Sequence, residues 1–129
     1  MRRFYEEVLG FTYFRQYPAT HPTIVFLTIA DLASPLGQGG HPQLFALIDV
    51  QRHPPAQGRF KGIDTSLSTF NHVAFEIPTT CYEDEKKRLE GFGLEVTRQQ
   101  FGDMNAKALF FRDPEGNLLE FICHDAADE

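Results

Sequence analysis

The chain has 129 residues, which suits one domain with a buried core. Its formal net charge is -6 at pH 7, and its longest basic cluster is the triplet Lys86-Lys87-Arg88. This composition argues against nucleic acid or an anionic membrane as the main partner. With two cysteines, and with no segment recognised as secretory or transmembrane, we expect a cytoplasmic protein without disulfide bonds.

The first half of the chain predicts one helix followed by strands. The helix starts almost at residue 1, Phe4–Leu9 forms its last part, and Gly10 closes it, because glycine tolerates the left-handed φ of a helix stop. Tyr5 is expected to pack this helix on the sheet. The strands are expected at residues 11–17, 23–30 and 44–50, with a Gly/Pro loop at 34–42 and a linker from residue 52 onward.

The second half predicts a strand, a helix and three more strands. In the first strand, residues 70–77, alternation puts His72 and Glu76 on one face and Val73 and Phe75 on the other. Thr80-Cys81-Tyr82-Glu83 matches a capping box, which predicts a helix that ends at Gly91 or Gly93. The last three strands are expected at residues 94–98, 108–112 and 117–124.

Glu120 stands out in the last strand because its neighbours are apolar. The turn Asp113-Pro114-Glu115-Gly116 precedes this strand, and Leu118, Glu120 and Ile122 share one face. A buried carboxylate survives only when it is paired, hydrogen-bonded, protonated or bound to a metal. The alternative is an edge carboxylate that faces water.

The two halves repeat the order of helix, glycine stop and three strands. Residues 43–48 lie opposite residues 117–122 in this repeat, which sets Ala46 against Glu120. The second half begins with a strand that has no counterpart in the first half. By the repeat, the counterpart of His72 would lie about eleven positions before Met1.

Three segments, in order and spacing, resemble the vicinal oxygen chelate superfamily, which includes glyoxalase, the fosfomycin and bleomycin resistance proteins and the extradiol dioxygenases. They are FYEEVLGF at residues 4–11, NHVAFE at 71–76 and FFRDPEGNLLEF at 110–121. The resemblance implies an α+β fold of paired βαβββ modules that form a cup-shaped mixed sheet. Within a single domain, 1–129, module one spans 1–51 and lacks its first strand, 52–69 is the linker, and 70–129 is module two.

The resemblance also implies a divalent metal ion, Fe, Mn, Zn or Ni, held by His72 and Glu120, with Glu120 as the catalytic residue. Phe110 and Phe26 become candidate pocket walls. Ala46 has no ligand atom, so the four-ligand arrangement of the glyoxalases is not expected. A His, His, Glu set would suit Fe(II) or Mn(II), and this chain supplies two of its three members. Taken alone, His72 would more often be a structural histidine.

These features favour a metal-dependent dioxygenase or lyase that acts on a small molecule with adjacent oxygens, as a homodimer. The strand missing from module one is explained by a start assigned too far downstream, by a strand lent from another subunit, or by loss of the metal. The alternatives are a metal-free, resistance-type binding protein and an inactive truncated form. Stoichiometric metal would favour the enzyme, and ligand binding in chelator would favour the binder. Glu76 is expected to face solvent, and the loop residues His41 and His53 are weaker candidates.

Overall fold

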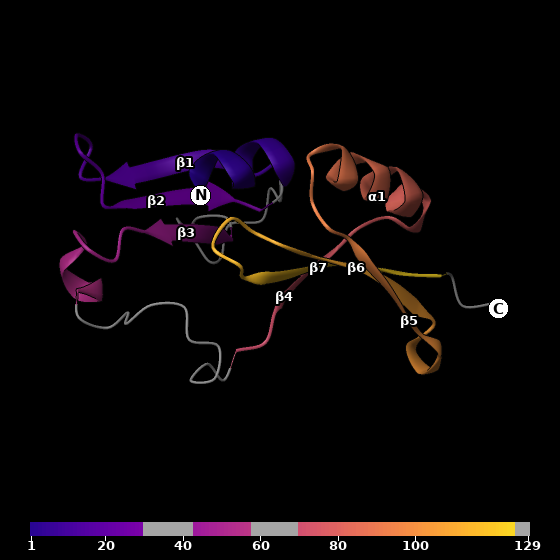
Figure 1. Cartoon of the computed structure of the whole chain (residues 1–129). Helices are drawn as coiled ribbons and strands as arrows, with labels where there is room; N and C mark the ends of the chain where they lie inside the picture. The colour runs from indigo at the N-terminus through magenta and orange to yellow at the C-terminus, as the bar shows by residue number, and fades with distance from the viewer. Residues whose placement is uncertain (30–42, 58–69, 126–129) are drawn as a thin grey trace, which may run out of the picture. The chain divides into compact units, whose positions relative to one another are not determined.

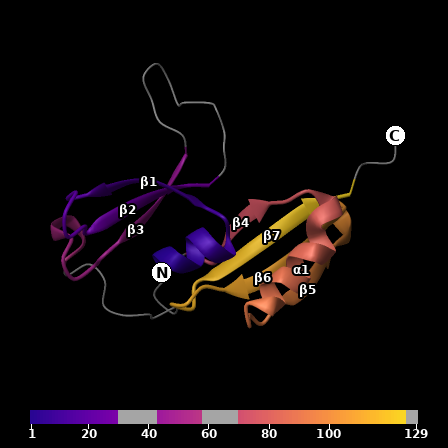
Figure 2. The ribbon, with the colours of Figure 1, turned by 90° about the horizontal axis from the view of Figure 1, so that it is seen from above.

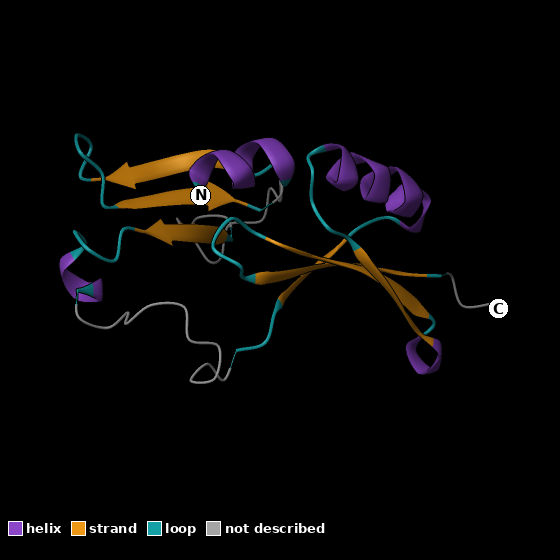
Figure 3. Cartoon of the chain, viewed as in Figure 1, coloured by secondary structure: helices purple, strands orange, loops and turns teal. Residues whose placement is uncertain are grey.

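The computed structural model describes residues 1–29, 43–57 and 70–125. The chain divides into two compact units, Met1–Asp64 and Thr65–Glu129, each with helical segments and one sheet (Figure 1). Helices and strands are both present in each unit, so the expected α+β class is confirmed (Figure 3). The Gly/Pro loop at 34–42 and most of the expected linker lie outside the described residues.

The first unit consists of a helical turn and a three-stranded antiparallel sheet. The helical segment η1 spans Phe4–Val8, and Gly10 follows it with a φ of +72°, as the sequence predicts. The sheet has the order β1-β2-β3. Its strands are β1 (Thr12–Tyr17), β2 (Ile24–Thr28) and β3 (Leu44–Ile48), and a short helical turn, η2 (Pro54–Ala56), comes after them.

Aromatic side chains join η1 to the sheet of the first unit. The Tyr5 ring is buried, with its centroid 4.6 Å from that of Phe45 in β3 and 5.6 Å from that of Phe11. The Phe11 and Phe45 rings also meet, edge to face, at 5.6 Å. Such aromatic pairs add stability beyond the area that they bury. The expected role of Tyr5 in packing the first helix on the sheet is confirmed.

The second unit has a four-stranded sheet of order β4-β7-β6-β5. β4 runs parallel to β7, and the other neighbours are antiparallel, so the sheet is mixed. The strands are β4 (Val73–Glu76), β5 (Thr97–Phe101), β6 (Ala106–Arg112) and β7 (Leu118–His124). The helical segments are η4 (Thr79–Cys81), α1 (Tyr82–Gly91) and η5 (Gly102–Met104).

Helix α1 covers one face of this sheet (Figure 2). The Tyr82 hydroxyl donates to the Ala108 carbonyl at 3.1 Å, and Lys107 lies over the Tyr82 ring. The side chains on this face form the buried core of the unit: Leu109, Phe111, Leu119, Phe121 and Cys123. Alternation along β6 and β7 sends Phe110 and Glu120 to the opposite face. The face that carries Phe110 and Glu120 is therefore not the face that α1 covers.

Two local expectations around α1 are wrong. The capping box does not form: η4 directly precedes α1, and neither segment has a side-chain capping hydrogen bond at its N-terminus. β5 begins at Thr97 instead of Leu94. The Leu94 amide donates to the Leu89 carbonyl at 3.3 Å, so this residue closes the helix end, and Gly93 there has a φ of +80°.

The turn between β6 and β7 forms as expected. The buried Asp113 carboxylate accepts the backbone amides of Glu115 and Asn117 at 2.9 and 3.0 Å, and Gly116 has a φ of +84°. An aspartate that binds backbone amides two and four residues later stabilises the turn locally. This turn fixes the register in which Glu120 lies opposite Phe110.

Candidate functional site

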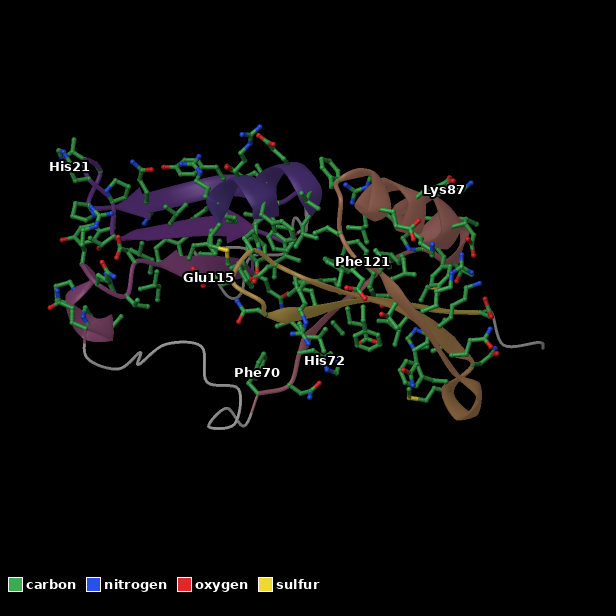
Figure 4. The ribbon with its side chains drawn as sticks, in the orientation of Figure 1. His21, Phe70, His72, Lys87, Glu115 and Phe121 are labelled. Atoms are coloured by element: carbon green, nitrogen blue, oxygen red, sulfur yellow. The ribbon has the colours of Figure 1, made fainter. Side chains whose placement is uncertain are left out.

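His72 and Glu120 come together from two neighbouring strands of the second unit. His72 directly precedes β4, and β4 pairs with β7 in a register that sets Ala74 beside Glu120. Residues two apart in a strand share a face, so His72 lies diagonally next to Glu120. The His72 Nε2 and Glu120 Oε2 atoms are 2.9 Å apart. Figure 4 shows His72 on the side of the sheet away from α1.

The burial of the two partners is unequal. The Glu120 side chain is 5% exposed, whereas that of His72 is 34% exposed. The alternative of a water-facing edge carboxylate is therefore wrong. Desolvation makes a lone buried carboxylate costly, and a hydrogen-bonded partner offsets that cost. His72 supplies this partner and keeps one side accessible to solvent.

Two more residues contact the His72 ring. The Asn71 Oδ1 atom lies 2.6 Å from His72 Nδ1. The Phe110 ring meets the imidazole edge to face, with centroids 5.5 Å apart and an interplanar angle of 83°. Phe110 also stands directly opposite Glu120 in the β6–β7 pairing. It therefore contributes an apolar wall beside both members of the pair.

Both ring nitrogens of His72 face oxygen atoms that accept hydrogen bonds. A neutral imidazole has a single N–H, so it can satisfy either the Asn71 amide oxygen or the Glu120 carboxylate. A second proton, or a cation bound between Nε2 and the carboxylate, would satisfy both. The donor set thus has the chemistry of a site for a positive charge.

The pair also fits two positions around one divalent ion. In an octahedral site with metal–ligand distances of about 2.1 Å, neighbouring donor atoms would lie about 3.0 Å apart. The observed separation of Nε2 and Oε2 is 2.9 Å. Within residues 1–29, 43–57 and 70–125, no group of three or more His, Cys, Asp or Glu side chains gathers for a metal. His72 and Glu120 therefore provide two donors, and a complete site needs more.

The other candidate residues have local partners of their own. Phe26 is in the first unit, in β2, where it pairs with Ala46 of β3. Glu76 has a side chain that is 75% exposed, as expected, and lies 3.5 Å from His124. His53 Nδ1 lies 3.0 Å from the Thr23 hydroxyl. His41 lies outside the described residues.

Asn71 is the contact that reading of the sequence missed. It formed part of the recognised segment NHVAFE, but no role was expected for it. Its signal is its position, because an amide side chain directly before a histidine at the start of a strand can reach the imidazole. That reach depends on the local backbone turn, which strand periodicity does not encode.

A family model, described as the Glyoxalase/Bleomycin resistance protein/Dioxygenase superfamily, matches residues 1–121. The chain belongs to this superfamily. The resemblance to vicinal oxygen chelate proteins is thereby confirmed. No curated protein sequence matches the chain. In the described part of the chain, no helix has both the length and the apolar character needed to cross a membrane.

Solved structures with the same fold cover almost the whole chain. A glyoxylase/bleomycin resistance protein/dioxygenase domain from Frankia sp. EAN1pec has a TM-score of 0.65 at 18% identity, over 98% of this chain and 82% of that chain. Lactoylglutathione lyase from Agrobacterium tumefaciens has 0.63 at 19%, over 95% and 81%. The fosfomycin resistance protein FosX from Listeria monocytogenes has 0.61 at 16%, over 97% and 82%. At these identities the likeness concerns the fold.

Proposed function

We propose that the protein is a vicinal oxygen chelate enzyme that uses a divalent metal ion to act, as a dioxygenase or a lyase, on a small molecule with two adjacent oxygen atoms. The observation that carries this proposal is the 2.9 Å contact between His72 Nε2 and the buried Glu120 Oε2. An imidazole and a carboxylate are ligands for Fe, Mn, Zn and Ni. Membership of the superfamily supports the same conclusion.

Each residue of the site has a distinct part in this proposal. His72 and Glu120 would hold the ion through an imidazole nitrogen and a carboxylate oxygen, and Phe110 would exclude water from their apolar side. A bound divalent ion supplies Lewis-acid stabilisation of negative charge that develops on the substrate oxygens. Glu120, kept dry by the sheet, has its charge available to the ion instead of to water.

Manganese is supported by a relative in the fold. One structure of Listeria FosX is a complex with Mn(II) and sulfate, and another, of a mutant of that protein, contains Mn(II) and 1S,2S-dihydroxypropylphosphonic acid. The latter compound carries two neighbouring hydroxyl groups. For this chain, Mn²⁺ is the first ion to test, followed by Fe²⁺, Zn²⁺ and Ni²⁺. We place the remaining ligands on a second subunit of a homodimer or on solvent.

Metal titration of the purified protein tests the proposal. We expect one Mn²⁺ per chain by calorimetry, and a loss of affinity of more than about 100-fold in His72→Ala and Glu120→Gln, because loss of a direct ligand exceeds loss of a supporting contact. His124→Ala is the matched control, since it removes a histidine that also lies near a glutamate, Glu76, but at 3.5 Å and in an exposed position. Equal metal binding by all four proteins would overturn the proposal.

A metal-free binding protein is the second candidate. One observation favours it: among the described residues, only His72 and Glu120 come together here as possible metal ligands, and their side chains already contact each other. In that case the pair would close one wall of a binding site beside Phe110. Undiminished binding of a catechol or a 1,2-diol in excess chelator would support this candidate. An inactive form would bind neither metal nor ligand.

A further inference from the structure

We propose that the free edge of β3 is a self-association site, where a second copy of the chain pairs with β3 in antiparallel fashion about a two-fold axis at Ala46. The inference concerns the first unit and goes beyond the proposed metal function, on which it does not depend. Three observations carry it: the outward backbone groups of β3, the apolar sequence of this strand, and the protection of the other edge strands.

The backbone of β3 presents a row of hydrogen-bonding groups on the side away from β2. β3 is the last strand in the order β1-β2-β3, and its register with β2 is regular (Figure 1). Where this register ends, the Asp49 amide donates to the Thr23 carbonyl at 2.8 Å. Backbone groups of successive residues in a strand alternate between its two edges, so those of Leu44, Ala46 and Ile48 point away from β2. In the described part of the chain, no backbone group pairs with them.

The side chains of β3 make this edge apolar. The strand reads Leu-Phe-Ala-Leu-Ile, without a charge, a glycine or a proline. Ala46 is exposed, and Ile48 is 44% exposed. A regular, apolar edge strand is a template for another strand. In the second unit the equivalent strand, β7, is paired on both sides, with β6 and with β4. The free edge of β3 thus corresponds to an edge that is covered in the second unit.

The other edge strands carry features that discourage the addition of a strand. β1 has a bulge between Tyr13 and Arg15, and the latter adds a charge. β4 has four residues and ends at Glu76, whose side chain is 75% exposed. β5 contains Arg98, whose side chain is 51% exposed. Sheets use bulges, short strands and charges in this way to prevent pairing between edges. β3 stands apart from these three strands, so it is the edge suited to bind a partner.

The sequence of β3 suits a copy of itself as that partner. In an antiparallel pair centred on Ala46, Leu44 stands opposite Ile48 of the partner subunit, and Phe45 stands opposite Leu47 of the partner subunit. Every outward amide and carbonyl of the strand then finds a hydrogen-bond partner. Apolar side chains face one another across the strands, which stabilises the pair, and no like charges meet. The pairing is the same for both copies, so it closes as a dimer.

A charge exchange at the two-fold axis tests this register. Ala46→Lys and Ala46→Glu each place two like charges opposite one another in the dimer, whereas an equimolar mixture places opposite charges there. Gln99→Lys is the matched control, because it adds the same charge at an exposed position of another edge strand, β5. The full chain and its variants are compared by sedimentation velocity over a wide range of concentration, in excess chelator. Circular dichroism checks that each variant is folded.

We expect a reversible equilibrium between monomer and dimer in the wild-type chain and in Gln99→Lys. Ala46→Lys alone and Ala46→Glu alone should lose the dimer, and their mixture should regain it. A monomeric wild-type chain would overturn the inference, because the edge would then be covered by another segment of the same chain or left open. So would assemblies larger than the dimer, a dimer that persists in either charged variant alone, a mixture that stays monomeric, or loss of the dimer in Gln99→Lys.

A milder substitution tests the same register should the charged variants fail to fold. Directly opposite residues that exchange hydrogen bonds have Cα atoms about 5.5 Å apart, which a disulfide can bridge. Ala46→Cys should therefore form a cross-linked dimer under mild oxidation. Leu44→Cys should not, because it stands opposite Ile48 of the partner subunit and about 13 Å along the strand from its own counterpart. The wild-type chain, with its free Cys81 and Cys123, gives the background. Equal cross-linking of the three proteins would overturn the inference.

Discussion

Replacement of His72 by alanine tests how far the buried Glu120 depends on its partner. Removing the hydrogen-bonded partner of a buried carboxylate leaves that group buried and unpaired, which costs up to about 3–5 kcal/mol of stability. His72 is 34% exposed, so water can replace part of the lost contact, and we expect about 2–3 kcal/mol. At this chain length each kcal/mol lowers Tm by about 3–4 °C, which gives a fall of about 6–12 °C.

Urea unfolding and thermal unfolding in excess chelator measure this cost without a contribution from bound metal. His72→Gln is the conservative variant, since its amide can still donate to Glu120, and it should lose less than half as much stability. Adding Glu120→Gln to His72→Ala removes the orphaned charge and should restore most of the lost free energy. A stability within about 0.5 kcal/mol of the wild-type value in His72→Ala would refute the reasoning, since Glu120 would then need no partner.

Two further substitutions test the framework of the second unit. Burial raises the pKa of Tyr82, so the folded chain holds this proton more tightly than the unfolded chain. Its contribution to stability is therefore complete below about pH 10 and is lost as the pH rises through the folded pKa. Tyr82→Phe removes the hydrogen bond to the Ala108 carbonyl and should cost about 1 kcal/mol of stability at neutral pH. The urea midpoint of this variant should also fall less at alkaline pH than that of the wild-type chain. An equal fall in both proteins would contradict this prediction. Gly116→Ala should cost about 1 kcal/mol of stability, because Gly116 has a φ of +84°. Gly91→Ala is the control, since Gly91 lies in a helix and a Cβ there would also meet no atom within 4 Å; it should be neutral or stabilising in the same assay. Equal effects of the two substitutions would contradict this prediction.

The convergence of His72 and Glu120 could be anticipated in part. Alternation in a strand has a period of two residues, so the face of each side chain follows from the sequence once the strand is recognised. That β4 and β7 are neighbours does not follow from alternation, because parallel pairing joins segments far apart along the chain. The resemblance to a superfamily predicted that His72 and Glu120 lie close together, and the 2.9 Å distance between His72 Nε2 and Glu120 Oε2 agrees with that prediction.

Other features were set by local competition that the sequence pattern does not resolve. Residues near Leu94 fit a strand by composition, yet the Leu94 amide closes the end of α1, so β5 starts at Thr97. Thr80 and Glu83 fit a capping box, but a 3₁₀ turn occupies that stretch, and the nearby Thr79 hydroxyl donates to the His124 carbonyl at 2.6 Å. In both cases a tertiary or helix-end hydrogen bond outweighed a weak local preference.

The repeat within the chain separates what the fold needs from what the site needs. In the first unit Ala46 of β3 stands opposite Phe26 of β2, and in the second unit Glu120 of β7 stands opposite Phe110 of β6. The same antiparallel pair thus forms with a methyl group at the position where the second unit has a carboxylate. A sheet of this kind does not require an acid there, and a buried acid is costly to place. The fold therefore does not explain why this position holds a glutamate. The remaining explanation is the contact with His72 and the positive charge that the two side chains together can bind.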